Sequence, residues 1–491
     1  MTDNLHLDNA LLFDTSAEGF NPGDFVCEGM QSLESLSTPY EVSLDLVCRI
    51  DGGVSPTAAD ELLVGNCQVS YGPGGIHRIS GVLRELERVD IHPSGTVSRY
   101  RAVMVPRFWL STLSYRSRVF NELNIPGILE EVLAEMSLVA GTDYELRLVG
   151  DYPVREYVVQ YEETDFAFMS RWMERLGIFY FFEQTDNGEK LIIADNNSEL
   201  LEVIDNPACT YGTSAGGPGA VGAVHEMRRR HRRMPLTQYV GDFNWRTPQR
   251  RVSAEVPIDE NYGVGLVAHY GDHFKDDDQG ELYAQVRAEA LMVHKTHFRG
   301  WTSNPDFKPG QRFSLTGSPM GELDIEYLIT SVEHQAVQHG DGAGSGSYRN
   351  DVQAIPYDVQ YRAPRHTRWP RIDGVMTAKI DAESVSSAAP VDDDGRYQVV
   401  MPYDLGGEHG GKATRWIRKA EPYSGPQYGM HFSLHVGTEV LLAHIGGDPD
   451  RPVIIGAVPN PTTSSPLTRS NSTRSAIRTR SGILIDFEDD A

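Results

Sequence analysis

Residues 157–182 read YVVQYEETDFAFMSRWMERLGIFYFF, and this stretch predicts a strand, a helix and a second strand in succession. Tyr157, Val159 and Tyr161 alternate as one face of the first strand. Thr164 can cap the helix, because its hydroxyl can accept a hydrogen bond from an amide of the first turn. Gly177 can end the helix, because glycine tolerates the left-handed conformation found at helix C-termini.

Between these two residues the apolar side chains recur at helical spacing: Phe166, Met169, Met173 and Leu176, with Trp172 widening the stripe. The second strand, residues 178–182, is apolar on both faces. The stretch contains no obvious nucleophile, metal cluster or phosphate loop. Its aromatic residues therefore indicate packing, in a core or against a partner, rather than chemistry.

The composition of the whole chain is that of a globular protein of several domains. It has 491 residues, of which 40% are hydrophobic and 23% are charged. The 47 glycines and 28 prolines favour many turns and a β-rich architecture. The formal net charge of −25 argues against a general nucleic-acid or anionic-membrane binder, because both partners would be repelled.

The N-terminus and the cysteines indicate the compartment. The first residues, MTDNLHLDNALLF, lack the basic start and continuous apolar segment of a signal peptide. No stretch reaches the roughly 18 apolar residues of a membrane span. The four cysteines favour reduced thiols, although a disulfide among Cys27, Cys48 and Cys67 stays open. We expect folding in the cytosol and, for any role outside the cell, export without an N-terminal signal.

Two β-rich regions flank a central helical part. In the first region, strands are predicted over residues 40–50, 76–91 and 98–108, separated by turn residues. A further β region runs from 224 to 359. Helices are predicted over 128–136 and 279–294. The glycine-rich residues 212–222 and 340–347 predict a flexible connector and a hairpin tip.

From about residue 371 the predicted strands are short and closely spaced: 395–403, 414–420, 439–445 and 451–458. This spacing predicts a small barrel of the oligonucleotide/oligosaccharide-binding (OB) type. Residues 461–481 are then rich in Ser, Thr, Pro and Arg and cannot form a core. Ile483, Ile485 and Phe487 alternate as one face of a final strand, and identical copies of the chain are the simplest source of its partners.

Together, these segments resemble the VgrG family, the trimeric spike of type VI secretion and a relative of contractile-phage tail hub and spike proteins. The resemblance is carried by QYEETDF at 160–166, GIFYFF at 177–182, GRYQV at 395–399 and TRSAIRTRSG at 473–482. An OB-domain signature lies between the last two and includes Trp416, Gly437, Asp448 and Arg451. The match covers the chain from about residue 25 to the C-terminus.

The resemblance implies a mainly β fold with helical insertions (α+β): two small hub β-barrels, an OB barrel and the start of an intertwined trimeric β-prism. The expected parts are a flexible leader (1–22), a first hub barrel with the helical insertion and the strand–helix–strand block (23–222), a second hub barrel (223–370), the OB domain (371–460), and the neck with the start of the prism (461–491).

Site residues follow from the same resemblance. Ile483, Ile485 and Phe487 are expected at the trimer interface. Four aromatic residues are expected in hub packing or in contact with the tube: Tyr161, Trp172, Phe179 and Phe181. Family members continue into a long needle where this sequence stops at Ala491, so the resemblance leaves open whether a tip protein binds.

The implied function is structural. The chain is expected to form a homotrimeric spike that docks on a hexameric, Hcp-like tube of a contractile injection apparatus and punctures the target membrane to deliver effectors. Further expected partners are baseplate proteins and a PAAR-type tip protein. The spike would be assembled in the cytoplasm and leave through the apparatus on firing. No catalytic, cofactor or metal-binding residues are expected.

Three clusters of charged or metal-ligating residues have alternative interpretations. The basic run RRRHRR at 228–233 suits an acidic partner or subunit, a phosphate backbone, or a solvated strand edge. The pairs His269/His273 and His294/His297 have helical spacing but no completing zinc ligand. The aspartate runs at 276–278 and 392–394 lack the spacing of a calcium loop and indicate exposed turns.

The alternative function is a tail-associated baseplate component that binds glycans or degrades peptidoglycan. Residues 372–460 contain 7 Lys and Arg against 12 Asp and Glu, which is the wrong sign for a phosphate groove, whereas glycan contact stays open. About 30 residues follow the OB segment, too few for the two-carboxylate cleft of a lysozyme domain.

Overall fold

The computed structural model describes residues 6–7, 11–50, 53–72, 75–91, 98–202, 208–212, 222–338, 346–386, 388–407 and 409–489. The chain forms two compact units that interleave along the sequence. Unit 1 consists of residues 1–114, 129–151 and 164–368, and unit 2 consists of residues 115–128, 152–163 and 369–491.

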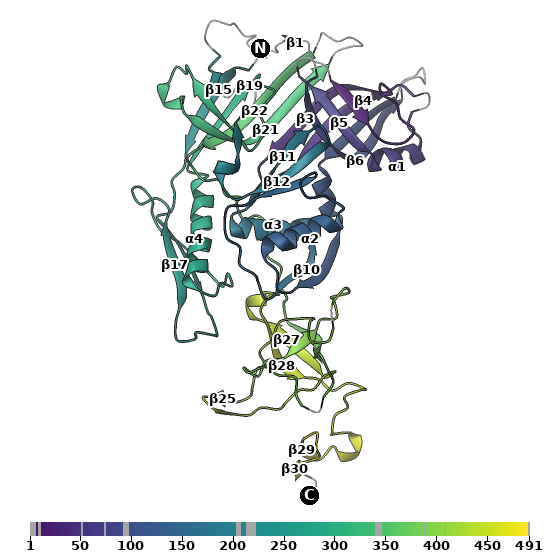
Figure 1. Ribbon diagram of the computed structural model, residues 1–491, viewed down its shortest axis with the longest axis vertical. Coiled ribbons are helices and arrows are strands. Elements are labelled where there is room, and N and C mark those ends of the chain that lie inside the picture. The colour runs from purple at the N-terminus through teal and green to yellow at the C-terminus, as the bar shows by residue number, and fades with distance from the viewer. Residues whose placement is uncertain are drawn as a thin grey trace. The chain divides into compact units, whose positions relative to one another are not determined.

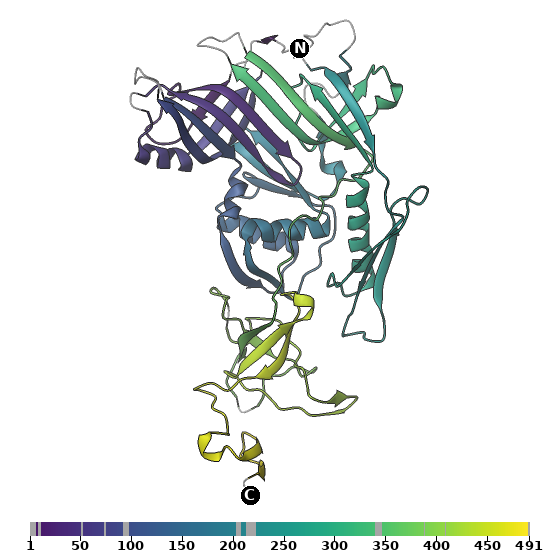
Figure 2. The ribbon, with the colours of Figure 1, turned by 180° about the vertical axis from the view of Figure 1, so that it is seen from behind.

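Unit 1 is built on a 14-stranded sheet whose main path is antiparallel throughout (Figures 1 and 2). Its path runs β15 (Val224–His231), β19 (Thr296–Thr302), β22 (Gly346–Pro356), β21 (Glu326–Gln338), β3 (Phe25–Ser35), β4 (Thr38–Cys48), β7 (Ser98–Val105), β6 (His77–Ile91), β5 (Asn66–Tyr71) and β2 (Leu12–Thr15). Beside this path lie β1 (His6–Leu7), β13 (Leu201–Glu202), β14 (Ala208–Thr210) and β20 (Gln311–Thr316).

The two β regions predicted from the sequence meet where β3 pairs with β21. This antiparallel ladder runs from Ser35 opposite Ser331 to Gly29 opposite Val337. The mainly β fold with helical insertions is confirmed. The expected pair of separate hub barrels is corrected, because the β3–β21 pairing joins both regions into one sheet, and its path does not close among the described residues.

The N-terminal segment belongs to this sheet over its described part. β2 pairs with β5, and Leu11 and Phe13 are buried. Residues 11–15 are therefore a packed strand and not part of a flexible leader, since burying large apolar side chains stabilises them in place. The predicted connector at 212–222 and hairpin tip at 340–347 lie almost wholly outside the described residues.

The stretch at 157–182 folds as predicted, into β10 (Val158–Thr164), α3 (Asp165–Leu176) and β11 (Phe179–Thr185). The Thr164 hydroxyl accepts a hydrogen bond from the amide of Ala167 at 3.1 Å. Gly177 ends the helix with a φ of 75°. β11 pairs with β12 (Gly188–Ala194), which in turn pairs in parallel with β9 (Tyr144–Arg147).

The other helices are α1 (Pro56–Val64), α2 (Ile125–Glu135) and α4 (Asp277–Met292), and the last two match the predicted helices. In Figure 1, α4 lies along a small sheet of unit 1 made of β17 (Val252–Pro257), β16 (Thr237–Asp242) and β18 (Leu266–Tyr270). Ala288 of α4 packs there against Met234 and Ile258.

Unit 2 contains a four-stranded antiparallel sheet in the order β24 (Gln398–Val400), β23 (Val375–Asp381), β27 (Glu439–His444) and β28 (Pro452–Ala457). The predicted strand at 414–420 is reduced to bridges: Ile417 pairs with Tyr397, and Lys419 pairs with Ile454. These bridges link the two edges of the sheet. Unit 2 also holds β8 (Tyr115–Phe120), which pairs with β10.

A buried polar cluster lies at the β3–β21 junction. Glu34 and His334 are 3% and 0% exposed, and Glu34 Oε1 lies 3.5 Å from His334 Nε2. The Tyr348 hydroxyl lies 2.5 Å from His334 Nδ1 and accepts a hydrogen bond from Asn350 at 3.0 Å. Burial raises the pKa of Glu34 to about 7 and lowers the pKa of His334 to about 3. The fold therefore favours the neutral form of both side chains.

Replacing Glu34 with Gln is expected to flatten the pH dependence of stability. The folded pKa of Glu34 lies above its ordinary value of 4.5, so stability falls as pH rises from 4.5 to about 7. The variant should gain on the order of 2 kcal/mol over the parent on going from about pH 5 to about pH 8. Denaturant unfolding followed by circular dichroism measures this difference.

The matched control is Glu85→Gln, at an exposed position on β6. It should leave the pH dependence unchanged. The lowered pKa of His334 makes stability rise with pH, and it does so equally in the parent and in the variant. The difference between the two proteins therefore reports on Glu34. Identical pH profiles for the parent and Glu34→Gln would contradict a buried, proton-retaining carboxyl group.

Candidate functional site

The four aromatic residues predicted for hub packing or tube contact divide into two groups. Trp172, Phe179 and Phe181 are 1%, 0% and 4% exposed and lie in the core of unit 1. The Phe179 ring meets the Tyr361 ring edge-on, with centroids 5.3 Å apart. Tyr161 is half-buried in unit 2 and packs edge-on against Tyr403 at 5.5 Å. Tyr161 is therefore the one of the four that keeps substantial exposure in the single chain.

Two residues of the OB-domain signature, Gly437 and Asp448, stabilise turns. Gly437 has a φ of 85°, which favours glycine, and its amide donates to the Ile380 carbonyl at 2.9 Å. The Asp448 carboxylate accepts a hydrogen bond from the Trp369 indole at 3.3 Å, and its carbonyl accepts one from the Arg451 amide at 2.9 Å. Trp416 is half-buried in the bridging segment.

Asp450 lies in the same loop and was missed by the sequence analysis as a site residue. It is 2% exposed, and its Oδ1 accepts a hydrogen bond from the Val159 amide of β10 at 2.7 Å. The Arg415 guanidinium donates to the Asp450 carbonyl at 2.9 Å and lies over the Tyr157 ring at 5.7 Å. This loop therefore ties the OB sheet of unit 2 to the strand that precedes α3.

The terminal strand has a partner within its own chain. β30 (Leu484–Glu488) pairs with β29 (Arg474–Arg478), which places Ile477 opposite Ile485. The expectation of a lone strand is wrong, because the arginine-containing segment before it supplies the second strand. Ile483, Ile485 and Phe487 are 67%, 52% and 59% exposed. The apolar face of the hairpin is thus uncovered in the single chain.

A second hairpin of unit 2 also exposes apolar side chains. It is formed by β25 (Ser424–Gly425) and β26 (Tyr428–Gly429). Four large apolar residues in or near it are 45–61% exposed: Tyr423, Tyr428, Met430 and Phe432. Clusters of this kind mark interaction surfaces on soluble proteins.

The histidines and aspartates considered as metal ligands lie on separate elements, in a helix cap or in a turn. His269 lies on β18 and His273 has a φ of 55°, so the two share no helix face. His294 follows α4, whereas His297 lies on β19. Asp276 caps α4 by accepting from the Gln279 amide at 2.9 Å. Asp392 accepts from the Arg396 amide at 2.8 Å within a turn.

Other predictions concern metals, thiols and membranes. In the described ranges, no group of three or more His, Cys, Asp or Glu residues is placed to hold a metal ion. The four cysteines are buried free thiols. Burial raises the pKa of Cys27 to about 12 and that of Cys67 to about 11. Among the described helices, none is long and apolar enough to cross a membrane.

Curated relatives match nearly the whole chain. The actin cross-linking toxin VgrG1 of Vibrio cholerae is 25% identical over 96% of this chain and 44% of its own length. The type VI secretion system spike protein VgrG3 of Vibrio cholerae is 25% identical over 96% of this chain and 47% of its own length. The spike protein VgrG1a of Pseudomonas aeruginosa is 26% identical over 94% and 71%, respectively. The chain therefore spans less than half of the two Vibrio relatives.

Solved structures share the fold. The Escherichia coli c3393 protein, a component of the type VI secretion system with structural similarity to T4 bacteriophage tail proteins gp27 and gp5, superposes with a TM-score of 0.67. It is 22% identical, and the match covers 91% of this chain and all of that one. A Francisella PdpA–VgrG complex gives a TM-score of 0.62 at 10% identity, covering 98% of this chain and 83% of that one.

Two family models match consecutive parts of the sequence. The type VI secretion system/phage-baseplate injector OB domain matches residues 385–458, and the phage tail baseplate hub (GPD) matches residues 33–340. These matches confirm the resemblance to VgrG spike proteins that the motifs indicated. Because the hub model covers more than half of the sequence, the chain belongs to the phage tail baseplate hub family.

Proposed function

We propose that three copies of this chain form the hub and spike of a contractile injection apparatus. The observation that carries the proposal is the uncovered apolar face of the terminal hairpin, in a chain of the baseplate hub family. In this proposal residues 23–222 and 223–370 form the hub, residues 371–460 the OB domain, and residues 461–491 the neck. The exposed side chains near β25 and β26 offer a second apolar surface for contacts between copies.

Burial of the hairpin face supplies the driving force for assembly. Ile483, Ile485 and Phe487 each contribute about 1.5–3 kcal/mol when fully buried. A threefold arrangement repeats this contribution in every copy. In the single chain the same side chains face water, so association lowers the free energy of the hairpin.

The partners and the action of the trimer follow from its likeness to spike proteins. It would dock on a hexameric, Hcp-like tube, contact baseplate proteins and carry a PAAR-type tip protein and effectors. It would assemble in the cytoplasm, leave through the apparatus and puncture the target membrane. The proposed role is mechanical, and the toxin activity in the name of one relative is not transferred to this chain, which spans 44% of that protein.

A mechanical role requires the OB sheet to stay attached to its neighbouring strand. The Asp450–Val159 hydrogen bond provides such an attachment inside unit 2, at a position that is 2% exposed. A hydrogen bond to a charged carboxylate in a buried place is stronger than one between neutral exposed groups. In the proposed spike, this hydrogen bond would help to keep β10 and the OB sheet together under force.

Introducing a charge on the hairpin face is expected to weaken the trimer. Ile485→Asp, alone or with Ile483→Asp and Phe487→Asp, places a carboxylate in the proposed interface and should shift the protein toward monomers. Leu484→Asp is the matched control, because Leu484 is 51% exposed, close to the 52% of Ile485, but lies on the opposite face of β30.

Light scattering coupled to size-exclusion chromatography measures the mass of each variant. The proposal requires a threefold mass for the parent and for Leu484→Asp, and a lower mass for Ile485→Asp. A trimer that survives the triple substitution would refute the hairpin interface. A parent that is monomeric at all concentrations would refute the proposed spike.

Removing the Asp450 carboxylate is expected to loosen β10. Asp450→Ala removes a buried hydrogen-bond acceptor of the Val159 amide and should destabilise unit 2 by about 1–3 kcal/mol. Hydrogen–deuterium exchange should show faster exchange at Val159. Asp393→Ala, in an exposed turn, is the control and should leave this exchange unchanged. Equal protection of Val159 in both variants would contradict the attachment.

A further inference from the structure

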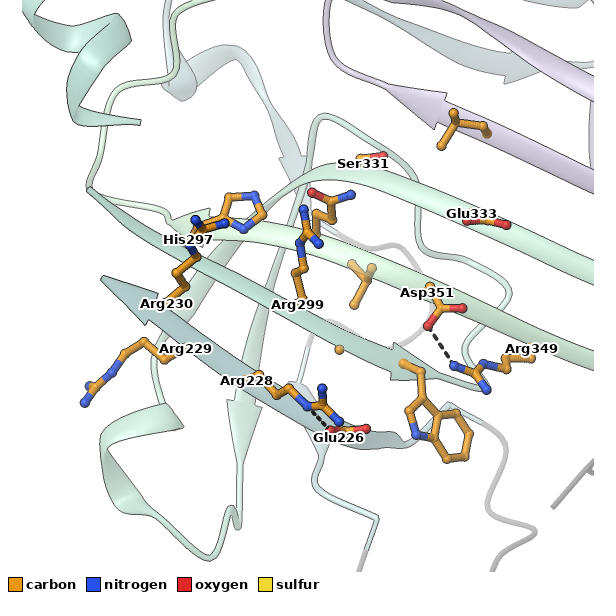
Figure 3. Close-up of a pocket in the computed structure, with 15 residues that line it drawn as sticks. Glu226, Arg228, Arg229, Arg230, His297, Arg299, Ser331, Glu333, Arg349 and Asp351 are labelled. Carbon is orange, nitrogen blue, oxygen red and sulfur yellow. Dashed lines mark hydrogen bonds and ion pairs between the residues drawn. The ribbon is translucent and has the colours of Figure 1, made fainter. Parts of the chain in front are cut away.

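An arginine-rich groove lies on one face of the main sheet of unit 1 (Figure 3). It has a volume of about 620 Å³ and is lined by residues of β15, β19, β22, β21 and β3. Alternate side chains of a strand share a face, so Arg228 and Arg230 of β15 lie beside His297 and Arg299 of β19. Arg229 points away from them and pairs with Glu322 at 2.7 Å (Figure 3).

The strand register brings two arginines, Arg228 and Arg299, together. Arg228 lies directly opposite Arg299, and Arg230 lies directly opposite His297. Like charges in directly opposed positions destabilise a sheet. Burial, followed by the charges of nearby cations, lowers the pKa of His297 to about 4, so this ring is neutral near pH 7. The repulsion therefore arises between Arg228 and Arg299, and the stability of the sheet does not explain why these two arginines lie opposite each other.

The chain neutralises part of this positive charge. Arg228 pairs with Glu226, and Arg349 pairs with Asp351 at 2.8 Å. Arg230 and Arg299 are exposed, and their side chains form no ion pair or hydrogen bond with the described residues. Arg230 and Arg299 hold diagonal positions on neighbouring strands, so each of their guanidinium groups is available on the same face to bind a carboxylate in a bidentate manner.

The end of the groove away from Arg230 is lined by two carboxylates and an aromatic ring. Glu333 lies opposite Asp351 and accepts hydrogen bonds from Gln31 at 2.7 Å and from Gln335 at 2.8 Å. Trp301 stacks on His225 at 4.1 Å. A phosphate backbone, which is negative along its whole length, would meet these two carboxylates. A polypeptide can place its acidic residues at the arginine end alone.

We propose that this groove docks an extended acidic segment of a partner polypeptide, whose carboxylates bind Arg230 and Arg299. The proposal goes beyond the spike function and does not depend on it. In a chain of net charge −25, an acidic partner is repelled by most of the surface, so a local cationic groove determines where it binds.

The test uses the full chain and a fluorescent peptide whose first half alternates Glu and Ser residues and whose second half is uncharged. Anisotropy should show saturable binding that weakens as salt is added. Arg230→Ala with Arg299→Ala should weaken binding about tenfold, because two ion pairs are lost. The double Lys variant should bind with intermediate affinity, because lysine keeps the charge but loses the bidentate geometry.

The matched control is Arg368→Ala with Arg469→Ala, which removes the same charge at two other exposed positions. It should bind the peptide as the parent does. An equal loss of binding in the control would overturn the proposal by showing that net charge alone attracts the peptide. No loss in the Arg230/Arg299 variant would overturn it by showing that the peptide binds elsewhere.

Two further arms test other occupants. Single-stranded DNA with the same net charge as the peptide should bind more weakly, and equal or tighter binding would assign the groove to nucleic acid instead. Light scattering tests a second copy of the chain. If the Arg230/Arg299 variant changes the oligomeric mass while the peptide fails to bind the parent, the occupant is another copy and the proposal is wrong.

Discussion

The pairing of β3 with β21 is the interaction on which the large sheet depends. It joins residues about 300 positions apart, such as Gln31 and Glu333, whose side chains form a hydrogen bond at 2.7 Å. Closing so long a loop costs entropy that local contacts cannot offset. The buried Glu34–His334 contact lies at the same junction. A slip of one residue would turn Glu34 to the opposite face, so the buried cluster helps to fix the register.

Elements with local signals were predicted from the sequence, whereas the pairing between them was not. Thr164 and Gly177 mark the ends of α3 because a cap and a left-handed glycine act within one helical turn. The Asp450–Val159 hydrogen bond spans 291 positions and has no local signature. The N-terminal strand was predicted to be loose, because its polar composition conceals the buried positions of Leu11 and Phe13.

The same distinction applies to the candidate sites. Aromatic density indicated packing at Trp172 and Phe179, but apolar residues look alike whether they face a core or a partner. The alternation of apolar and polar residues identified the face of Ile485 and Phe487. It did not reveal β29, because the arginines of that strand interrupt an apolar pattern. The run at 228–233 was conspicuous. The positive charge beside this run comes partly from Arg299, and only the strand register shows that Arg299 lies opposite Arg228.

Unit 2 has a buried apolar core around Ile380, Val440 and Leu442, but one buried carboxylate and an exposed apolar hairpin depart from the usual distribution of side chains. Asp450 is 2% exposed, whereas Ile483 is 67% exposed and Phe487 is 59% exposed. Buried polar groups are costly unless they are hydrogen-bonded, and the Oδ1 of Asp450 accepts such a bond from the Val159 amide. Ile483 and Phe487 stay exposed to solvent among the described residues. The internal hydrogen bonds of unit 2 therefore hold the OB sheet together, whereas covering the apolar face of the terminal hairpin would lower its free energy further, which is the driving force in the proposed trimer.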